Sequence, residues 1–261
     1  MRLPPSDAAR QLARSWARLL ARVARLTGRH AIEFFFPRVC PECGQTADRA
    51  GRTICWNCFS GIEIHAGIVC DRCGLAPAGA VTGAFVCGAC RQDPPAFDRA
   101  CSAAAFRGTL RDALLAFKYH RATWLLSDLA DLLHGGVTSR LDAASIDAVV
   151  PVPLHPSRQR ERTYNQAEML AADLARRLGV PCRAAAMVRC RLTRSQTRLG
   201  AAERRRNVAG AFAVADAGGV RGRTLLVVDD VMTTGATLHE TARELRRAGA
   251  WRIYAATVAR G

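Results

Sequence analysis

The stretch TLLVVDDVMTTGATL, residues 224–238, decides the fold of the C-terminal part of this chain. Four aliphatic residues lead into two adjacent carboxylates, Asp229 and Asp230, and a loop of Thr and Gly follows. A short aliphatic run bounded by turn residues is typical of a strand buried on both faces. We therefore predict a strand over 224–230, a tight loop, and a helix over 236–250.

Strand and helix patterns alternate from Phe97 to the end of the chain. The further predicted strands cover 99–106, 146–153, 184–190 and 252–260. The further predicted helices cover 108–120, 122–136 and 165–179. This alternation predicts an α/β domain over residues 96–261, with a parallel sheet that carries helices on both faces.

The loop after the acid pair has the composition of a phosphate-binding site. Gly235 permits a tight turn, so that the amides of residues 233–237 converge at the start of a helix, where anions are favoured. The expected phosphate contacts are Thr233, Thr234, Gly235, Ala236 and Thr237. The carboxylates would repel a phosphate, but they suit the hydroxyls of an attached ribose, with or without Mg²⁺. An ordinary capped helix after a strand is the alternative.

Four CxxC pairs lie within residues 37–95, which we predict to form a double zinc ribbon. Two CxxC turns supply the tetrahedral set of four thiolates that Zn²⁺ prefers, and consecutive pairs give two closed, structural sites. The first site takes Cys40, Cys43, Cys55 and Cys58, and the second takes Cys70, Cys73, Cys87 and Cys90. Disulfides, a redox pair and an iron–sulfur cluster are the less favoured alternatives. The unpaired Cys101, Cys182 and Cys190 are predicted to pack in strands.

Residues 1–36 contain a basic amphipathic helix over 6–27, whose leucine-rich face is expected to pack on the rest of the protein. Contact with a membrane surface or nucleic acid, or a transit peptide, is the alternative. The net charge of +16 favours a polyanionic partner, with a solvated basic surface as the other interpretation. Neither a bilayer-spanning run nor a secretory signal is found, so we expect a cytoplasmic protein. The only lysine, Lys118, is predicted to lie on a helix surface, with a position facing the pocket as the alternative.

Residues 225–237 together resemble the phosphoribosyl pyrophosphate (PRPP) motif of type I phosphoribosyltransferases. The segments 114–120 (LLAFKYH), 149–171 and 194–212, with the cysteine pairs, resemble the ComF (competence protein F, GntX-like) family. The resemblance covers the chain from Cys40 on. Where the family pattern reads Arg-Gly-Phe-Asn-Gln, residues 162–166 read Arg-Thr-Tyr-Asn-Gln.

The resemblance implies a type I phosphoribosyltransferase fold with a PRPP pocket at the carboxyl ends of the strands. Asp229 and Asp230 would hold the ribose as the catalytic pair, with Asp230 as a base for a nucleobase-like acceptor. Residues 233–237 would hold the 5-phosphate. Arg158 and Arg162 would meet the diphosphate, together with Mg²⁺.

The resemblance further places residues 195–206 as a flexible hood, from which Arg198 would contact PRPP. For Arg198 and residues 204–206, a solvated run of charge is the alternative. The implied reaction is displacement of pyrophosphate from PRPP. Two other functions stay open: an accessory protein in natural transformation that binds single-stranded DNA or the DNA-uptake machinery, with PRPP as a regulatory ligand, and a structural adaptor with a vestigial pocket.

Overall fold

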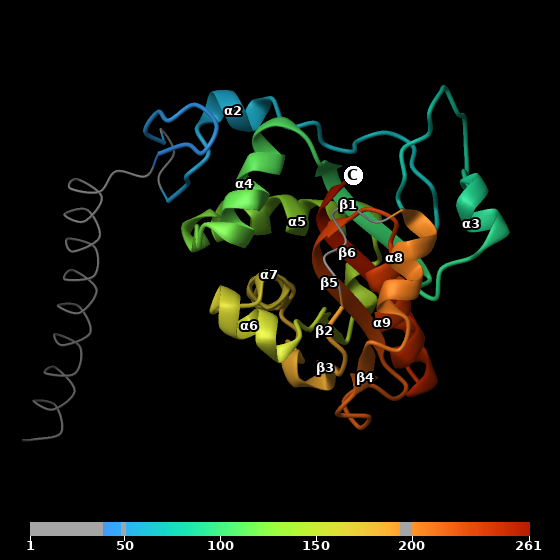
Figure 1. The fold of residues 1–261 in the computed structure, drawn as a ribbon. Helices are drawn as coiled ribbons and strands as arrows, with labels where there is room; N and C mark the ends of the chain where they lie inside the picture. The colour runs from blue at the N-terminus through green and yellow to red at the C-terminus, as the bar shows by residue number, and fades with distance from the viewer. Residues whose placement is uncertain (1–38, 48–50, 194–199) are drawn as a thin grey trace, which may run out of the picture.

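A computed structural model describes residues 39–47, 51–193 and 200–261. The predicted N-terminal helix and Arg198 lie outside the described residues. Figure 1 shows the α/β body, with the cysteine-rich segment, coloured blue to teal, running along one side of it. Among the described helices, none has both the length and the apolar character that crossing a membrane requires.

The centre of the body is a four-stranded parallel sheet in the order β1-β6-β5-β2. The strands are β1 (Arg99–Ala105), β2 (Ala148–Pro151), β5 (Thr224–Met232) and β6 (Arg252–Arg260). The predicted parallel sheet is therefore confirmed. Strand β5 continues past residue 230, where we expected it to end, so both carboxylates lie within the strand.

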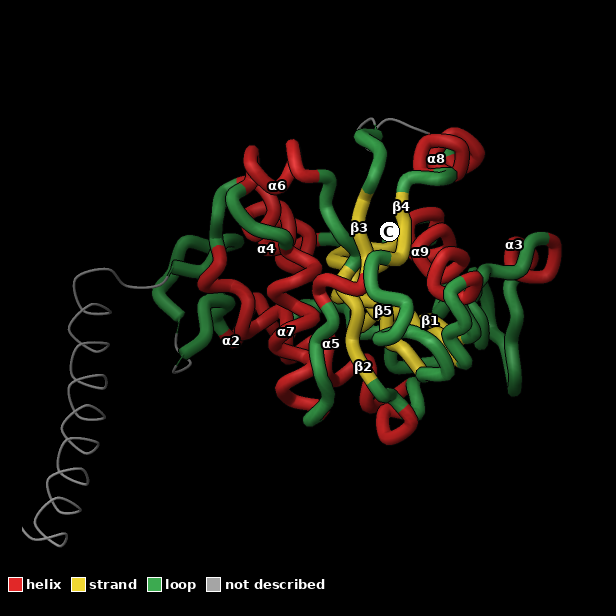
Figure 2. Tube along the Cα trace, turned by 90° about the horizontal axis from the view of Figure 1, so that it is seen from below, coloured by secondary structure: helices red, strands yellow, loops and turns green. Residues whose placement is uncertain are grey.

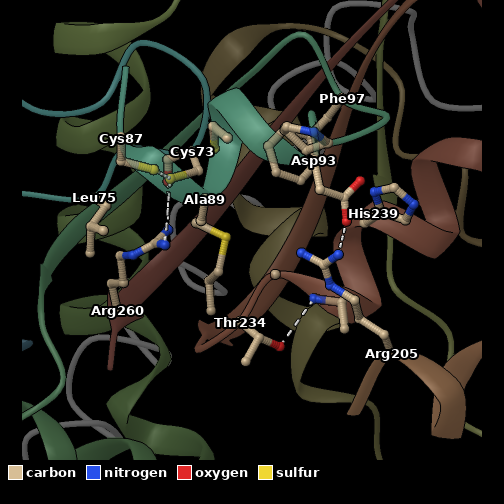
Figure 3. A pocket seen from close by; sticks show the side chains of 15 residues that line it. Cys73, Leu75, Cys87, Ala89, Asp93, Phe97, Arg205, Thr234, His239 and Arg260 are labelled. Carbon is tan, nitrogen blue, oxygen red and sulfur yellow. Dashed lines mark hydrogen bonds and ion pairs between the residues drawn. The ribbon is translucent and has the colours of Figure 1, made fainter. Parts of the chain in front are cut away.

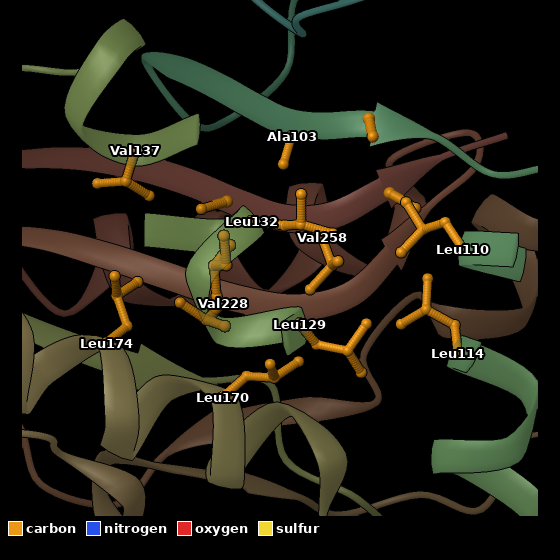
Figure 4. Packing of buried hydrophobic residues seen from close by; sticks show 14 of the residues in the cluster. Ala103, Leu110, Leu114, Leu129, Leu132, Val137, Leu170, Leu174, Val228 and Val258 are labelled. Atoms are coloured by element: carbon orange, nitrogen blue, oxygen red, sulfur yellow. The ribbon is translucent and has the colours of Figure 1, made fainter. Parts of the chain in front are cut away.

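Helices cover both faces of the sheet, as predicted. On one face, Leu226 and Val228 of β5 pack against α5 (Leu126–Arg140) and α7 (Gln166–Leu178), in the cluster drawn in Figure 4. On the other face, Leu225 and Val227 pack with α9 (Ala236–Arg247). The alternation of neighbouring side chains between two buried clusters explains why β5 carries an unbroken apolar run.

Several elements differ from the sequence-based expectation. The predicted strand 184–190 is a 3₁₀ turn (Ala184–Ala186) followed by the short β3 (Met187–Arg189). Strand β3 pairs antiparallel with β4 (Phe212–Val214), and Figure 2 shows this pair, here called the flap, apart from the four-stranded sheet. Of the unpaired cysteines, Cys101 is buried in β1, as predicted, whereas Cys190 is exposed. The prediction that Cys190 packs in a strand is therefore wrong.

The remaining helices of the body border the sheet edge at which the strands end. Helix α4 (Gly108–Tyr119) was predicted, but α6 (Pro156–Arg162) and α8 (Ala201–Val208) were not. Proline at the first position of α6 and a His155 side chain that accepts from the amide of Ser157 start that helix.

The cysteine-rich segment packs directly on the body. It contains the short helices α2 (Trp56–Ser60) and α3 (Gly88–Gln92). The buried carboxylate of Asp128 on α5 accepts from the amides of Thr53 (2.8 Å) and Ile54 (3.4 Å). Gly74, at φ +69°, approaches β1 so closely that a Cβ there would lie 2.8 Å from the carbonyl oxygen of Ala100. These contacts hold the first half of the segment against α5 and the second half against β1.

Replacing Asp128 by Ala should lower the free energy of unfolding by about 2–4 kcal/mol, because two buried amides lose their acceptor. Asp128→Asn keeps an acceptor oxygen and serves as the control, with a smaller expected loss. Urea unfolding measures both variants. Equal stability of Asp128→Ala and the wild type would show that this carboxylate does not anchor the segment.

Candidate functional site

The acid pair lies near the end of β5 and is neutralised from α4. The Nζ of Lys118 lies 2.7 Å from Oδ2 of Asp230, whose side chain is 8% exposed. Burial raises the pKa of Asp230, but the charge of Lys118 and its hydrogen bond outweigh burial and hold the pKa below its ordinary value. The same pair raises the pKa of Lys118. Asp230 and Lys118 therefore form an ion pair at neutral pH.

The neighbouring carboxylate has the opposite character. Burial, and then the charge of Asp230, raise the pKa of Asp229 to about 7. Lys118 opposes this rise without cancelling it. Two adjacent acids with separated pKa values are a common arrangement where one group must accept a proton near neutral pH.

The position of Lys118 corrects our prediction of a surface lysine. Its ammonium turns into the site and lies against a carboxylate 112 residues away in the chain. One sequence signal could have found it, because the chain has 38 Lys and Arg residues and Lys118 is the only lysine among them. A bias this strong against lysine makes the single exception informative.

The loop after β5 leads into the N-terminus of α9, as the sequence suggests. Gly235 has φ +76°, a conformation that favours glycine, and a Cβ there would lie 3.4 Å from Sδ of Met232. Thr233 and Thr234 precede it, and Ala236 and Thr237 form the first turn of the helix. Because the N-terminus of a helix carries partial positive charge, this end of the site suits an anion.

The turn between α6 and α7 connects the end of α4 to the segment that follows β2. Thr163 has φ +73°, so threonine occupies a left-handed position where the family pattern has glycine. The hydroxyl of Tyr164 donates to the carbonyl of Phe117, and Nε2 of Gln166 donates to the carbonyl of Lys118 (3.1 Å). Nδ2 of Asn165 donates to the carbonyl of Val152 (3.1 Å). The turn therefore holds the end of α4, and with it Lys118, beside the sheet.

The two arginines that we assigned to a diphosphate lie on α6. Arg162 places its guanidinium carbon 5.1 Å from the ring centre of Tyr119 and donates to Gln166. Its charge lowers the pKa of Lys118, so the two cations lie close together. Arg158 forms an exposed ion pair with Glu161 at 2.8 Å. Arg162 therefore lies close to Lys118, the cation that pairs with Asp230. Arg158 is instead directed toward solvent.

The eight paired cysteines gather into two groups of four, each made of two consecutive CxxC pairs. Within each group all four sulfurs lie within 4.8 Å of one another. The sulfurs of Cys43 and Cys55 are 3.7 Å apart, as are those of Cys73 and Cys87. Such separations fit four thiolates around a tetrahedral Zn²⁺. With four protein ligands each, both sites are closed and structural in type.

Backbone amides prepare the thiolates for a cation. Burial raises the pKa of Cys40, but amides of residues 43, 55 and 42 bring it down to about 7. Cys70 repeats this pattern in the second group. Burial raises its pKa, but the amides of residues 73, 87 and 72 lower it to about 7. The two groups therefore share one local design, in which backbone amides lower the pKa of the first cysteine.

The second cysteine group shares a cleft with the loop between β5 and α9 (Figure 3). Its lining includes Cys73, Cys87 and Cys90 on one side and Thr234, Gly235 and Ala236 on the other. Arg260, the last residue of β6, donates to the carbonyl oxygen of Cys73 (2.5 Å) and to its sulfur (3.5 Å). The guanidinium stabilises negative charge on the thiolate and ties the metal group to the strand end beside the loop.

A second contact closes the same cleft from the side of α8. Arg205 pairs with Asp93, and the amide of Ala96 donates to Nδ1 of His239 on α9 (3.2 Å). Helix α8, which overlaps the C-terminal part of the predicted hood, is thereby attached to the cysteine-rich segment. Sequence periodicity carries no signal for either contact, because each joins residues more than a hundred positions apart.

Comparison with known proteins places this architecture in a family. The chain is 31% identical over 219 residues to competence protein F of Haemophilus influenzae, which covers 82% of this chain and 93% of that protein. The chain belongs to the competence protein F family. Family members in other organisms include the DNA utilization protein YhgH of Escherichia coli K12, 32% identical over 76% of this chain and 92% of that protein. Competence protein ComFC of Bacillus subtilis is 26% identical over 75% of this chain and 79% of that protein.

Two family models match separate parts of the chain. Residues 31–91 match the double zinc ribbon domain, and residues 165–261 match the phosphoribosyl transferase domain. The second match includes β5, the acid pair and the loop that follows it. The suspected family and fold class are thus confirmed.

Proposed function

We propose that this protein binds PRPP at the acid pair of β5, beside α4 and the start of α9. The observation that carries this proposal is the acid pair near the end of β5, in which Asp230 is buried and paired with Lys118, directly upstream of a glycine-turned helix N-terminus. Asp229 and Asp230 would accept hydrogen bonds from the ribose hydroxyls. The loop at Gly235 would bind the 5-phosphate. Arg162, with Arg158 after a rotation away from Glu161, would meet the diphosphate through bidentate contacts.

We further propose that the pocket supports phosphoribosyl transfer. The bond between the anomeric carbon and the diphosphate oxygen would break, the diphosphate would leave with the bonding pair, and a nucleophile would bond to that carbon. Bound Mg²⁺ would add positive charge at the departing diphosphate. Asp229 suits the role of acceptor for the nucleophile's proton better than Asp230, our original choice, because the pKa of Asp229 lies near 7 while Lys118 keeps Asp230 ionised.

A second candidate is an accessory function in which the protein binds nucleic acid. PRPP would then regulate that binding or have no role in it. The printed names of the relatives, competence protein F and DNA utilization protein, favour it. The net charge of +16 agrees with a nucleic-acid partner. On this account, single-stranded DNA should bind with an affinity that falls steeply with salt and is unchanged in Asp229→Asn.

The two functions separate in one experiment on the zinc-loaded protein. Release of pyrophosphate from PRPP and Mg²⁺ is followed against a panel of nucleobases, with Asp229→Asn as the control. Base-dependent release that disappears in the variant supports transfer. PRPP binding without release leaves a ligand-binding role, and DNA binding without PRPP binding supports the accessory function.

The affinity for PRPP should rise with pH between about 6 and 8. Asp229 has its pKa raised to about 7, so it is largely protonated below that pH and cannot accept two ribose hydroxyls. Binding should then weaken toward about tenfold per pH unit below pH 7, with uptake of the lost proton by buffer. Calorimetry in buffers of different ionisation enthalpy measures this. In Asp229→Asn, any remaining pH dependence of PRPP affinity comes from titration of the ligand itself. If affinity changed with pH equally in the variant and the wild type, Asp229 would not be the titrating group.

The same raised pKa has the opposite effect on the ligand-free protein. The folded state holds the Asp229 proton more tightly than the unfolded chain does. This group's contribution to the free energy of unfolding is therefore fully present below about pH 4 and is lost as the pH rises through 7.

A further inference from the structure

Three arginines and one tryptophan lie together at the edge of the sheet where β5 and β6 begin. We call Arg221, Arg223, Trp251 and Arg252 the basic patch. The carbonyl of Arg223 accepts hydrogen bonds from the amides of Trp251 (2.9 Å) and Arg252 (3.3 Å). Cγ of Arg221 lies 3.4 Å from the position that a Cβ on Gly249 would take. The segments before β5 and before β6 thus bring the four residues side by side.

The basic patch lies at the opposite end of the sheet from the acid pair. Parallel strands all begin at one edge, and Asp229 follows Arg223 by six positions along β5. At roughly 3.3 Å per residue, the backbone at the patch is about 20 Å from the backbone at the acid pair. None of the four residues lines the cleft beside the second cysteine group. The patch is therefore separate from the proposed PRPP site.

The arginines of the basic patch have no acid to neutralise them. None of the three forms an ion pair within the part of the chain that the structure describes, and Nε of Arg223 is buried there without a hydrogen-bond partner. The nearby carboxylates have other partners: Asp98 pairs with Arg246 (2.6 Å), and Asp147 accepts from the amide of Thr224 (2.7 Å). Three uncompensated positive charges on one surface favour a polyanion.

The indole of Trp251 adds a second kind of contact to this surface. Its side chain is 71% exposed, the largest fraction among the exposed large apolar side chains that the structure describes. The backbone of Trp251 is nevertheless fixed, because its amide donates to Arg223 and its carbonyl accepts from Nη1 of Arg246 (2.6 Å). A single exposed apolar side chain is ordinary. An indole held among unpaired guanidiniums, however, offers a face for a base beside cations for phosphates.

We propose that the basic patch binds single-stranded nucleic acid, with one base stacked on Trp251 and the flanking phosphates on Arg221, Arg223 and Arg252. This inference rests on the nucleic-acid candidate under Proposed function, to which it assigns a surface, and it does not depend on PRPP binding. A single strand fits better than a duplex, because duplex bases stack on one another and leave no free face for the indole.

The test measures fluorescence anisotropy of a labelled oligothymidine with the zinc-loaded, full-length protein over a range of salt concentrations. Trp251→Ala should weaken binding by about fivefold to a hundredfold, because it removes the stacking contact. It should leave the slope of log affinity against log salt unchanged. Arg221→Gln and Arg223→Gln should each flatten that slope by about 0.7, because each removes one phosphate contact. Trp251→Phe keeps an aromatic face and should retain most of the affinity.

The matched controls lie away from the basic patch. Trp124→Ala removes a tryptophan that is 52% exposed in the 3₁₀ turn Thr123–Leu125, and Arg111→Gln removes an arginine whose side chain is 53% exposed in the first turn of α4. Each control should bind oligothymidine within about twofold of the wild type. Urea unfolding checks that every variant folds. A duplex of the same sequence should bind more weakly than the single strand, and oligouridine distinguishes RNA from DNA.

The outcomes separate the patch from the function. Wild-type binding that is unchanged in Trp251→Ala, or lost equally in Trp124→Ala, would overturn the basic patch while leaving the nucleic-acid function in place. No binding of any oligonucleotide by the folded wild type would overturn both. Anionic phospholipid vesicles test the other polyanionic surface. If Trp251→Ala lost vesicle binding but kept oligothymidine binding, the patch would be a membrane contact, and the inference would be wrong.

Discussion

Loss of zinc from either cysteine group should unfold the segment around it. Apparent binding free energies for structural zinc are on the order of 10–16 kcal/mol, which exceeds the free energy of unfolding of most domains. The segment holds few large buried side chains besides its cysteines, Ile54 and Ile62. Cys43→Ser and Cys73→Ser should each reduce the metal content from two zinc ions per chain to one.

The two variants should differ in their effect on PRPP. The second group shares a cleft with the phosphate loop, and Arg260 connects Cys73 to the end of β6. The first group instead packs on α5, where Asp128 accepts hydrogen bonds from the amides of Thr53 and Ile54. Cys73→Ser should therefore weaken PRPP binding, and Cys43→Ser should leave it within about threefold.

Metal analysis and PRPP titration of both variants measure this, with Cys190→Ser, an exposed cysteine outside either group, as the control. Two zinc ions in Cys73→Ser would contradict the ligand assignment. Equal PRPP affinities in Cys43→Ser and Cys73→Ser would contradict the coupling between the second group and the loop.

The two aspartates should respond oppositely in stability and alike in binding. At pH 8, Asp229→Asn removes a charge that repels the adjacent Asp230, so the free energy of unfolding should rise by about 2 kcal/mol. Asp230→Asn leaves the ammonium of Lys118 without its partner, so stability should fall by about 2–4 kcal/mol. Both variants should weaken PRPP binding by about tenfold to a hundredfold, because each removes a charged acceptor for ribose hydroxyls.

Urea unfolding with and without PRPP separates these effects. The stabilisation by saturating PRPP should shrink in both variants, although one starts above the wild type and the other below. Since stability and binding change in opposite directions for Asp229→Asn, its binding loss cannot come from unfolding. A stabilised Asp229→Asn that binds PRPP as tightly as the wild type would remove that residue from the pocket.

The sequence predicted well those elements that local pattern specifies. The apolar run of β5 and the glycine at 235 define a buried strand and a tight turn, and Asn165 and Gly179 cap α7 as expected. The CxxC spacing predicted the two metal groups for the same reason, because each turn brings two sulfurs together by itself.

The missed elements lack such a pattern. Helix α6 buries no side chain, and α8 is strongly polar, so neither has an apolar face to recognise. Lys118 acquires its role only from tertiary neighbours. Lys118 lies in the last turn of α4, and the neighbouring residues in the sequence carry no signal of its contact with Asp230, 112 positions away.

Binding of PRPP tests the account most directly. The zinc-loaded wild-type protein is titrated with PRPP and Mg²⁺ in a calorimeter at pH 8, beside Asp229→Asn. We expect one PRPP bound per chain, competition by ribose 5-phosphate, and a clear loss of affinity in the variant. A folded, zinc-loaded wild type that shows no binding at millimolar PRPP would contradict the pocket assignment.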